Sequence, residues 1–324
     1  MKRGALATLV FASLLAAEAG AVPSVWQRAR NPERARAQRA LVDLERWTLG
    51  AYDESVRVGE RRGLLLGAVA MAELRGAAQL PDVRIKFLLG EVLADYSVQR
   101  EDDARALLEA ALAEAPNHPL AAAAWATLAE LRVRLGAAAA AYAAFARALE
   151  RTWRPNPRAH VYGARAGLGM QQGDAMAAIR DFRRALRVAT VADLVVILRY
   201  GLAVALERSG DLPAALRELK AARALKPKAS AAVLGALELP EVRFVPSYEF
   251  FYYKGLEAMA EGRFAESGAD ARLDYRAAAD FFAQYLEHAE PATPWVGHAE
   301  RLRAACEREL SEEGQSKGGG RFSR

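Results

Sequence analysis

The sequence has few of the residues that most often build catalytic or metal centres. Its 324 residues include one cysteine and four histidines. The single cysteine, Cys306, cannot form an internal disulfide bond, and we expect it to be a small buried core residue. The histidines, His118, His160, His288 and His298, include no pair at the i, i+4 spacing of a helical zinc site. We therefore expect no disulfide framework and no metal site.

Nucleotide-binding and nucleophile motifs are absent from the sequence as well. It contains no glycine-rich phosphate loop, no Gly-x-Ser-x-Gly elbow and no paired cysteines. The three consecutive glycines at 318–320 belong to a C-terminal tail. Adjacent carboxylates such as Asp102 and Asp103 are typical of helix caps and solvated surfaces. We therefore expect no catalytic residues, no cofactor, and a protein that is not an enzyme.

Lysine is scarce, because only seven of the 45 basic residues are lysine and arginine supplies the rest. The formal net charge is +5, and it would fall to about +4 if Lys2, Arg3 and Glu18 were removed with an N-terminal leader. This charge is small for strong binding to a phosphate backbone. Nucleic-acid binding through the arginines is therefore the weakest hypothesis, and we expect no nucleic-acid partner.

A period of 37 residues dominates the chain from Leu88 to Pro227. Alanines recur at this spacing, at Ala104, Ala141, Ala178 and Ala215. The same spacing relates three further sets: Ala111, Ala148, Ala185 and Ala222; Leu108, Phe145, Phe182 and Leu219; and Gly136, Gly173 and Gly210. A fixed period of this length is typical of one supersecondary unit stacked on copies of itself.

Each repeat predicts two helices joined by a glycine turn. Trp125, Leu128 and Leu131 have the spacing of one helical face. Gly136 follows them, and glycine commonly ends a helix in the left-handed conformation. In the next two repeats the turn becomes glycine-aspartate, at 173–174 and 210–211. The aspartate is expected to cap the second helix. The recurring alanines are expected where helices cross, and the phenylalanines between neighbouring hairpins.

This pattern resembles the tetratricopeptide repeat (TPR) family. The best-matching unit, which starts at Ala122, carries Trp125, Leu128, Ala129, Gly136, Ala141, Phe145 and Ala148 at the family's positions. Units starting at Ala159 and Val196 match at fewer positions, and one starting at Ile85 lacks the glycine. The period is three residues longer than the family's usual 34, and Arg132, Gly169 and Leu206 replace the family's tyrosine. The resemblance implies an all-α, TPR-like solenoid of about five to six stacked helical hairpins.

The rest of the chain is divided around this array. We expect a signal peptide at 1–21, a degenerate helical pair at 22–84, TPR-like repeats at 85–227, an extended connector at 228–247, a divergent repeat with a C-terminal capping helix at 248–312, and a flexible tail at 313–324. Ala278 and Phe282 come 11 residues later than the pattern requires. This delay predicts an insertion at 263–274, around Glu266 to Leu273, and long loops of this kind are often functional.

The N-terminal 21 residues have the three parts of a secretory signal. Lys2 and Arg3 are followed by a short apolar run and then by small residues that end at Ala21. We expect cleavage near Ala21 and a periplasmic or secreted protein. An uncleaved anchor or a buried first helix is the alternative.

The TPR resemblance also implies a binding surface. In this family the first helices of the hairpins line a concave groove that takes peptides or partner domains. The family's positions place ten residues in the groove: Lys86, Tyr96, Glu130, Arg134, His160, Gln171, Tyr200, Glu207, Arg208 and Tyr252. An ordinary solvated helix face is the alternative reading of these positions.

The favoured function is a non-enzymatic scaffold of the cell envelope that binds another envelope protein or a peptide. Reversing the charge of Arg134 and Arg208 together is expected to weaken partner capture without unfolding the protein. The alternative is an accessory subunit of a cell-wall or secretion enzyme complex, or a weak enzyme with a site near the 263–274 insertion. Membrane contact is expected only through the partner or an uncleaved signal segment.

Overall fold

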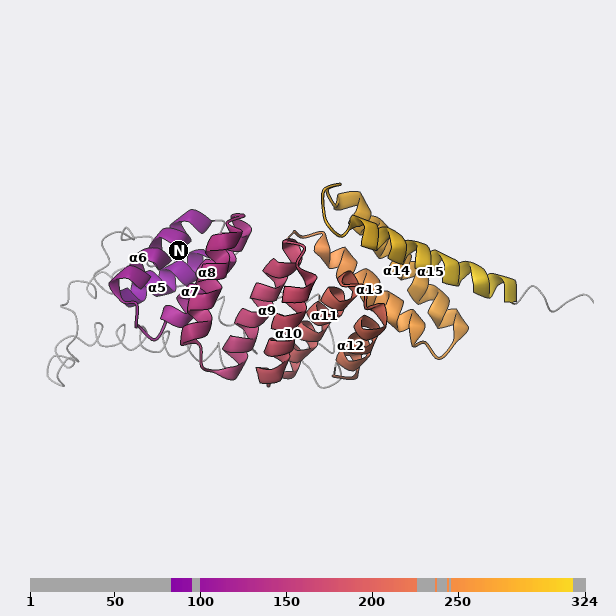
Figure 1. The fold of residues 1–324 in the computed structure, drawn as a ribbon, viewed down its shortest axis with the longest axis horizontal. Helices are drawn as coiled ribbons and strands as arrows, with labels where there is room; N and C mark the ends of the chain where they lie inside the picture. The colour runs from indigo at the N-terminus through magenta and orange to yellow at the C-terminus, as the bar shows by residue number, and fades with distance from the viewer. Residues whose placement is uncertain (1–82, 95–99, 226–236, 238–243, 245, 317–324) are drawn as a thin grey trace, which may run out of the picture. The chain divides into compact units, whose positions relative to one another are not determined.

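The computed structural model describes residues 83–94, 100–225, 237, 244 and 246–316 (Figure 1). Within these ranges the chain forms eleven α-helices and no β-strand. The expected all-α class is therefore confirmed for this part of the chain. The signal segment, nearly all of the N-terminal pair, most of the 228–247 connector and most of the tail lie outside the described residues.

The chain divides into two compact units, residues 1–161 and 162–324. The described helices of the first unit are α5 (Val83–Leu93), α6 (Glu101–Glu114), α7 (Ala121–Arg134), α8 (Ala138–Arg151) and the start of α9 (Pro155–Gln171). The second unit holds the rest of α9, then α10 (Ala175–Val188), α11 (Ala192–Arg208), α12 (Leu212–Leu225), α13 (Glu249–Arg263), α14 (Gly268–His288) and α15 (Val296–Ser316).

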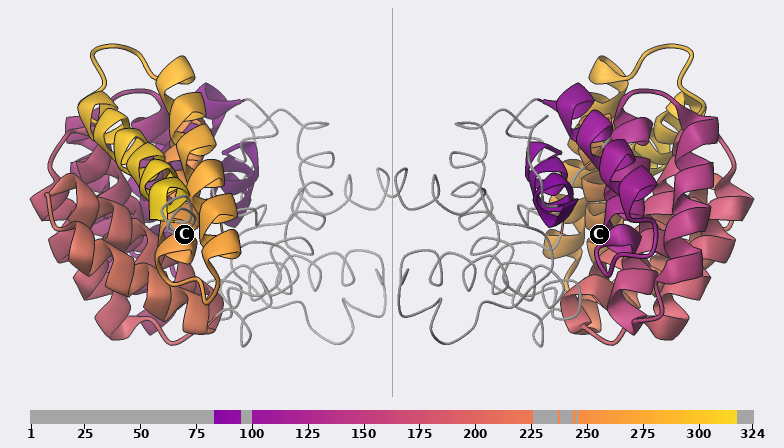
Figure 2. Two further views of the ribbon diagram at one scale, coloured as in Figure 1. Left: turned by 90° about the vertical axis from the view of Figure 1, so that its right-hand side faces the viewer. Right: turned by 90° about the vertical axis from the view of Figure 1, so that its left-hand side faces the viewer.

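Helices that follow one another along the chain pack in pairs. In the first unit α5 packs against α6 and α7 against α8. In the second unit α11 packs against α12 and α13 against α14, which also contacts α15 (Figure 2). Each helix has an apolar face that it cannot cover alone, so pairing is the simplest way to bury it.

The turns after α7, α9 and α11 have the predicted geometry. Gly136, Gly173 and Gly210 have positive φ angles of 71°, 79° and 94°, which residues with a side chain rarely adopt. Asp174 then accepts a hydrogen bond from the backbone N–H of Ala177 at 2.8 Å, and the following repeat has the equivalent bond at its own aspartate. These caps satisfy a backbone donor at the start of the second helix.

The repeated alanines lie in the interior, as predicted. All eight alanines of the two 37-residue series are fully buried. Phe182 of α10 packs on Gly201 of α11, where an added Cβ would lie 2.4 Å from the ring. The phenylalanine therefore joins the second helix of one hairpin to the first helix of the next, and only glycine at 201 permits this approach.

The expected insertion at 263–274 is not a long loop. The chain leaves α13 at Arg263 and enters α14 at Gly268, so most of the extra residues lengthen the second helix. Ser267 caps this helix by accepting a hydrogen bond from the backbone N–H of Asp270 at 3.1 Å. Ala271 is buried, which anchors the added turns. The extra length of this repeat is therefore helix and not an exposed loop.

Helix α13 runs antiparallel to α11. Tyr200, in the middle of α11, contacts Glu257 in the second half of α13, whereas Arg208, at the end of α11, contacts Glu249 at the start of α13. In the first unit, by contrast, the first helices α5 and α7 run parallel. Glu91 of α5 contacts Thr127 of α7, and seven residues later on α7 Arg134 contacts Ala94, which is also later along the chain than Glu91. The expected divergent repeat is thus present as a hairpin, but its first helix is reversed.

Candidate partner-binding surfaces

In the first unit, the first helices of successive hairpins form one continuous side. We call this side, made by α5, α7 and the start of α9, the first-helix face. Thr127 of α7 donates a hydrogen bond to Glu91 of α5 at 3.1 Å. Glu130 of α7 lies 3.1 Å from Nε2 of His160 on α9. The side chains of Glu130 and His160 are 44% and 54% exposed, so this pair is available to solvent.

Two other predicted groove residues of the first unit have internal partners. Lys86 pairs with Glu114 of α6. Arg134 donates a hydrogen bond from Nη2 to the carbonyl oxygen of Ala94 at 2.6 Å, just beyond the end of α5. A cation at this position also offsets the negative end of the helix dipole. Tyr96 lies outside the described residues. The unit therefore brings Glu130 and His160 together, and it uses Lys86 and Arg134 to join helices.

In the second unit, most of the predicted groove is covered. Tyr200, Glu207, Arg208 and Tyr252 are all buried, and Gln171 is half-buried at the end of α9. Every residue of α11 from Tyr200 to Arg208 is buried, so this end of the helix has no open side. These four positions therefore do not line an open groove in the structure.

Arg208 is the centre of the contacts that close this side. Its guanidinium lies 4.4 Å from the ring centre of Tyr252 and 4.8 Å from that of Trp295. Its Nη2 pairs with Glu249 at 2.6 Å. The two rings and one carboxylate replace the water that the cation would otherwise bind. Reversing the charge at Arg208 would place a carboxylate beside Glu249, so the expectation that this change leaves the fold intact is not supported.

Glu207, the neighbour of Arg208, is held from two directions. The Tyr252 hydroxyl donates a hydrogen bond to one carboxylate oxygen, and Nδ1 of His298 on α15 lies 3.1 Å from the other. Trp295, in the loop before α15, donates from Nε1 to the carbonyl oxygen of Met170 on α9 at 3.0 Å. The start of α13 and the loop between α14 and α15 thus cover the end of α11 together.

Burial shifts the pKa values of the groups in this cluster. It raises the pKa of Tyr252, and the adjacent Glu207 carboxylate raises it further. It also raises the pKa of Tyr253 to about 12. Burial by itself would lower the pKa of Arg208, but Glu249 and the surrounding tyrosines outweigh it and the pKa rises. At neutral pH the cluster therefore holds neutral tyrosines around a charged arginine.

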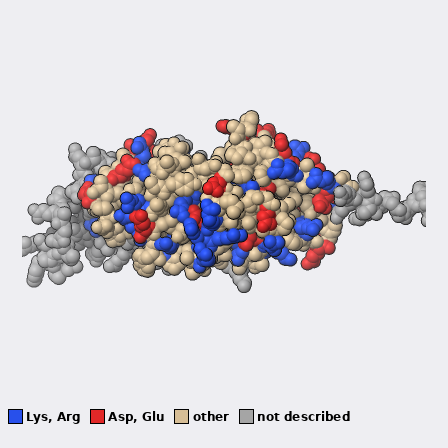
Figure 3. Space-filling view, viewed as in Figure 1, with Lys and Arg blue, Asp and Glu red and all other residues tan. Residues whose placement is uncertain are grey.

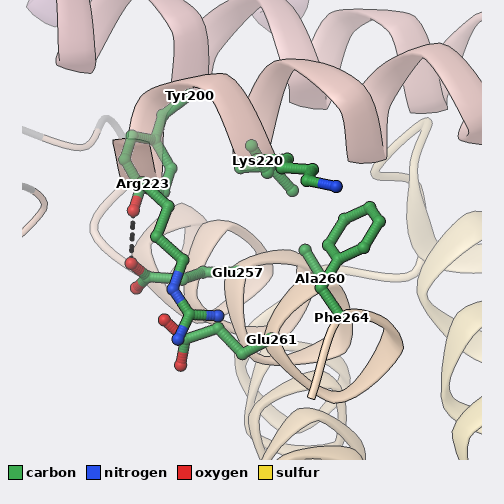
Figure 4. A pocket seen from close by; sticks show the side chains of 8 residues that line it. Tyr200, Lys220, Arg223, Glu257, Ala260, Glu261 and Phe264 are labelled. Carbon is green, nitrogen blue, oxygen red and sulfur yellow. Dashed lines mark hydrogen bonds between the residues drawn. The ribbon is translucent and has the colours of Figure 1, made fainter. Parts of the chain in front are cut away.

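A small hollow lies between α11, α12 and α13 (Figure 4). The Tyr200 hydroxyl donates to Glu257, which also accepts from Lys254 at 3.1 Å. Figure 4 shows the Arg223 guanidinium beside Glu257 and Glu261. The hollow has about 10 Å³ of water-accessible space, enough for about one water molecule. It is far smaller than a typical ligand pocket of roughly 300–1,000 Å³.

A row of arginines on α10 was not among the residues predicted from the sequence. Arg180, Arg183, Arg184 and Arg187 are all exposed, and Figure 3 shows Lys and Arg gathered over this helix. Their spacing of i, i+3, i+4 and i+7 places them on one side of the helix. This spacing is visible in the sequence, but the TPR positions direct attention to the first helices, and α10 is a second helix.

The part of the chain that the structure describes contains no group of three or more potential metal ligands. In the same ranges, none of the helices is both long enough and apolar enough to cross a membrane. No protein-family model matches this chain, and a search of curated proteins finds no relative. The function of this chain is therefore inferred from its sequence pattern and from these surfaces.

Proposed function

We propose that this protein is a TPR-like helical-repeat scaffold of the cell envelope that binds a partner protein or peptide. Support comes from the 37-residue period together with the hairpins that carry it. The glycine turns, aspartate caps and buried alanines recur at the same positions in successive hairpins. Stacked hairpins of this kind create extended surfaces that suit partner binding.

The observation that carries the proposal is the Glu130–His160 pair. It joins first helices of successive hairpins, and both side chains remain exposed. These two residues hold positions that the family uses for recognition. Because the equivalent end of α11 in the second unit is buried, we assign the binding surface to the first-helix face of the first unit, where Glu130 and His160 keep 44% and 54% of their side chains exposed.

Capture from envelope fractions of the source cells tests this proposal. The bait is the full chain, and bound proteins are identified by peptide mass spectrometry. We expect a specific partner with the wild-type chain and its loss with the double variant E130K/H160E. A matched control is R147E/E150R, which reverses an exposed pair on α8, a second helix, and it should retain the partner.

Two results would count against the proposal. If E130K/H160E captured the same partner equally well, the first-helix face would not be the binding surface. If neither the wild type nor the control enriched any protein over an empty matrix, the scaffold function itself would be rejected. Circular dichroism of both variants establishes that the helices are intact.

A further inference from the structure

The exposed side of α10 carries a concentrated positive charge. We call Arg180, Arg183, Arg184 and Arg187 the α10 arginine ridge. The helical rise of about 1.5 Å per residue gives the ridge a length of roughly 10 Å. Met176 lies one turn before it and is 58% exposed. The helix therefore offers one apolar side chain followed by four guanidinium groups.

The ridge has almost no internal charge compensation. Asp181 is the only acidic residue of α10, and it is buried. Among the described residues, Arg180, Arg183 and Arg187 have no ion-pair partner. Like charges three and four residues apart destabilise an isolated helix. An acidic ligand would remove this repulsion, so the helix is better suited to a bound anion than to an empty surface.

Part of the ridge is fixed in advance. Arg165 of α9 forms a two-point contact with Asp181, with distances of 2.6 and 2.8 Å from Nε and Nη2. Asp181 also accepts from Arg184 Nη1 at 3.0 Å. This chain of contacts holds the middle of the ridge in one geometry. A binding group that is already ordered loses less conformational entropy when a ligand arrives.

We propose that the α10 arginine ridge docks an acidic segment of a partner protein. Guanidinium groups bind carboxylates with paired hydrogen bonds, so glutamates or aspartates repeated at helical spacing would match the ridge. An apolar side chain next to them would cover Met176. The inference rests on the proposed scaffold function and names a second surface for it, on the second helix of a hairpin and not on a first helix.

The observations favour an acidic protein segment over nucleic acid. Affinity for nucleic acid comes mainly from neutralising phosphates, with about 6–10 contacts in a typical example, whereas the ridge offers four arginines on one helix. An exposed methionine also suits a protein side chain, because phosphate backbones have no apolar group to place there.

The experiment uses the full chain and a fluorescein-labelled acidic peptide. The peptide has glutamates at i, i+3, i+4 and i+7 and a leucine one turn away; a second peptide has glutamine at the same four positions. We expect fluorescence anisotropy to show binding of the glutamate peptide only. The variant R180Q/R183Q/R187Q should weaken binding at least about tenfold, which corresponds to roughly 1.4 kcal/mol.

A matched control removes the same charge elsewhere in the second unit. Arg276 of α14 and Arg301 and Arg308 of α15 are exposed and have no ion-pair partner in the described part of the chain. R276Q/R301Q/R308Q should bind the glutamate peptide within about twofold of the wild type, a difference of less than 0.5 kcal/mol. Equal weakening by the two variants would show that net charge alone acts, and it would overturn the proposal.

Two further probes distinguish other anionic ligands. Binding of a single-stranded oligothymidine, or of phosphatidylglycerol vesicles, that exceeds binding of the glutamate peptide and is lost in the ridge variant would overturn the acidic-protein proposal. The proposal for the ridge can also be rejected while the proposed scaffold function is retained. If peptide binding is absent while envelope capture still requires Glu130 and His160, then only the ridge inference is rejected.

Discussion

At the scale of single residues, Arg208 is one of the few buried charged side chains that the structure describes. It is buried, stacked between Tyr252 and Trp295 and paired with Glu249. Burying a charge is costly unless the charge is paired and hydrogen-bonded. The contacts of Arg208 therefore depend on one another. If either Arg208 or Glu249 is removed, the remaining charge is buried without a partner, which is unfavourable.

Arg208→Met should be among the most destabilising single changes in the second unit. The methionine keeps part of the packing between the rings but leaves the Glu249 carboxylate without its cation, and this should lower the free energy of unfolding by about 3–5 kcal/mol. Urea denaturation followed by circular dichroism measures the change. The double variant R208M/E249Q should recover part of the loss. R303Q, which breaks an exposed pair on α15, should change stability by less than about 1 kcal/mol.

The turn glycines allow a second test at this scale. Gly210→Ala should lower stability by about 1–2 kcal/mol, because its φ of 94° is unfavourable for a residue with a Cβ. Gly167 lies inside α9, and an added Cβ there would contact nothing within 4 Å. Gly167→Ala should therefore raise stability by about 0.5–1 kcal/mol. Thermal and urea unfolding measure both changes in stability. If both variants were stabilised, or both destabilised, this explanation would be contradicted.

Cys306 provides a chemical test of burial. It is fully buried on α15, and this burial raises the pKa of its thiol to about 12. Because the thiolate is the reactive form, iodoacetamide at pH 8 should leave the folded protein unmodified and should alkylate it fully in urea. Mass spectrometry gives the extent of reaction. Rapid alkylation of the folded protein would show that α15 does not remain packed.

At the scale of elements, the antiparallel contact between α11 and α13 determines which surfaces remain open. The start of α13 contributes Glu249 and Tyr252 to the interface, and Tyr253 interacts electrostatically with Arg208. Burial raises the pKa of Tyr252 and Tyr253, so both are protonated in the folded state well above pH 10. This contact should therefore be sensitive to strongly alkaline conditions.

We expect the free energy of unfolding to decrease between pH 10 and about 12. In this window the unfolded chain releases tyrosine protons that the folded chain retains, so deprotonation favours unfolding as pH rises. Below pH 10 this contribution is constant. Tyr253→Phe should reduce the slope by up to about 1.4 kcal/mol per pH unit. Urea titrations at several pH values measure it, and an unchanged slope in the variant would contradict the assignment.

The sequence predicted hairpins well and their mutual arrangement poorly. Gly173 with Asp174, and Phe182 with the alanine series, specify local geometry, because a turn or a helix crossing depends on nearby residues. The reversed α13 depends instead on contacts such as that between Glu207 and His298, 91 residues apart. No periodic pattern contains such a pair.

Contacts between residues far apart in the sequence also determine which candidate binding residues are buried. Arginine and glutamate are rarely buried, so Glu207 and Arg208 appeared to be surface residues. Their burial follows from the tyrosines, tryptophan and opposite charges that α13 and α15 bring to them. Glu130 and His160, by contrast, keep 44% and 54% of their side chains exposed where α7 and α9 meet.

At the scale of the whole molecule, the division into two compact units predicts that a destabilising substitution in one unit affects mainly that unit. Repeat proteins interact mainly between neighbouring units, so a change in one region need not propagate. Arg208→Met should increase amide hydrogen exchange in α11, α13 and α15 and leave α5 to α8 unchanged. Exchange measured by mass spectrometry tests this. A uniform loss of protection in both regions would indicate one cooperative unit instead.

The closure of α11 also bears on how such a chain can lengthen. Duplication of a hairpin adds a copy only where the preceding copy presents a free apolar edge for it to stack upon. After α12 the next first helix enters reversed, and aromatic and charged side chains occupy the side that a newcomer would need. A duplicated hairpin could therefore not stack on this side of α11 without displacing those side chains.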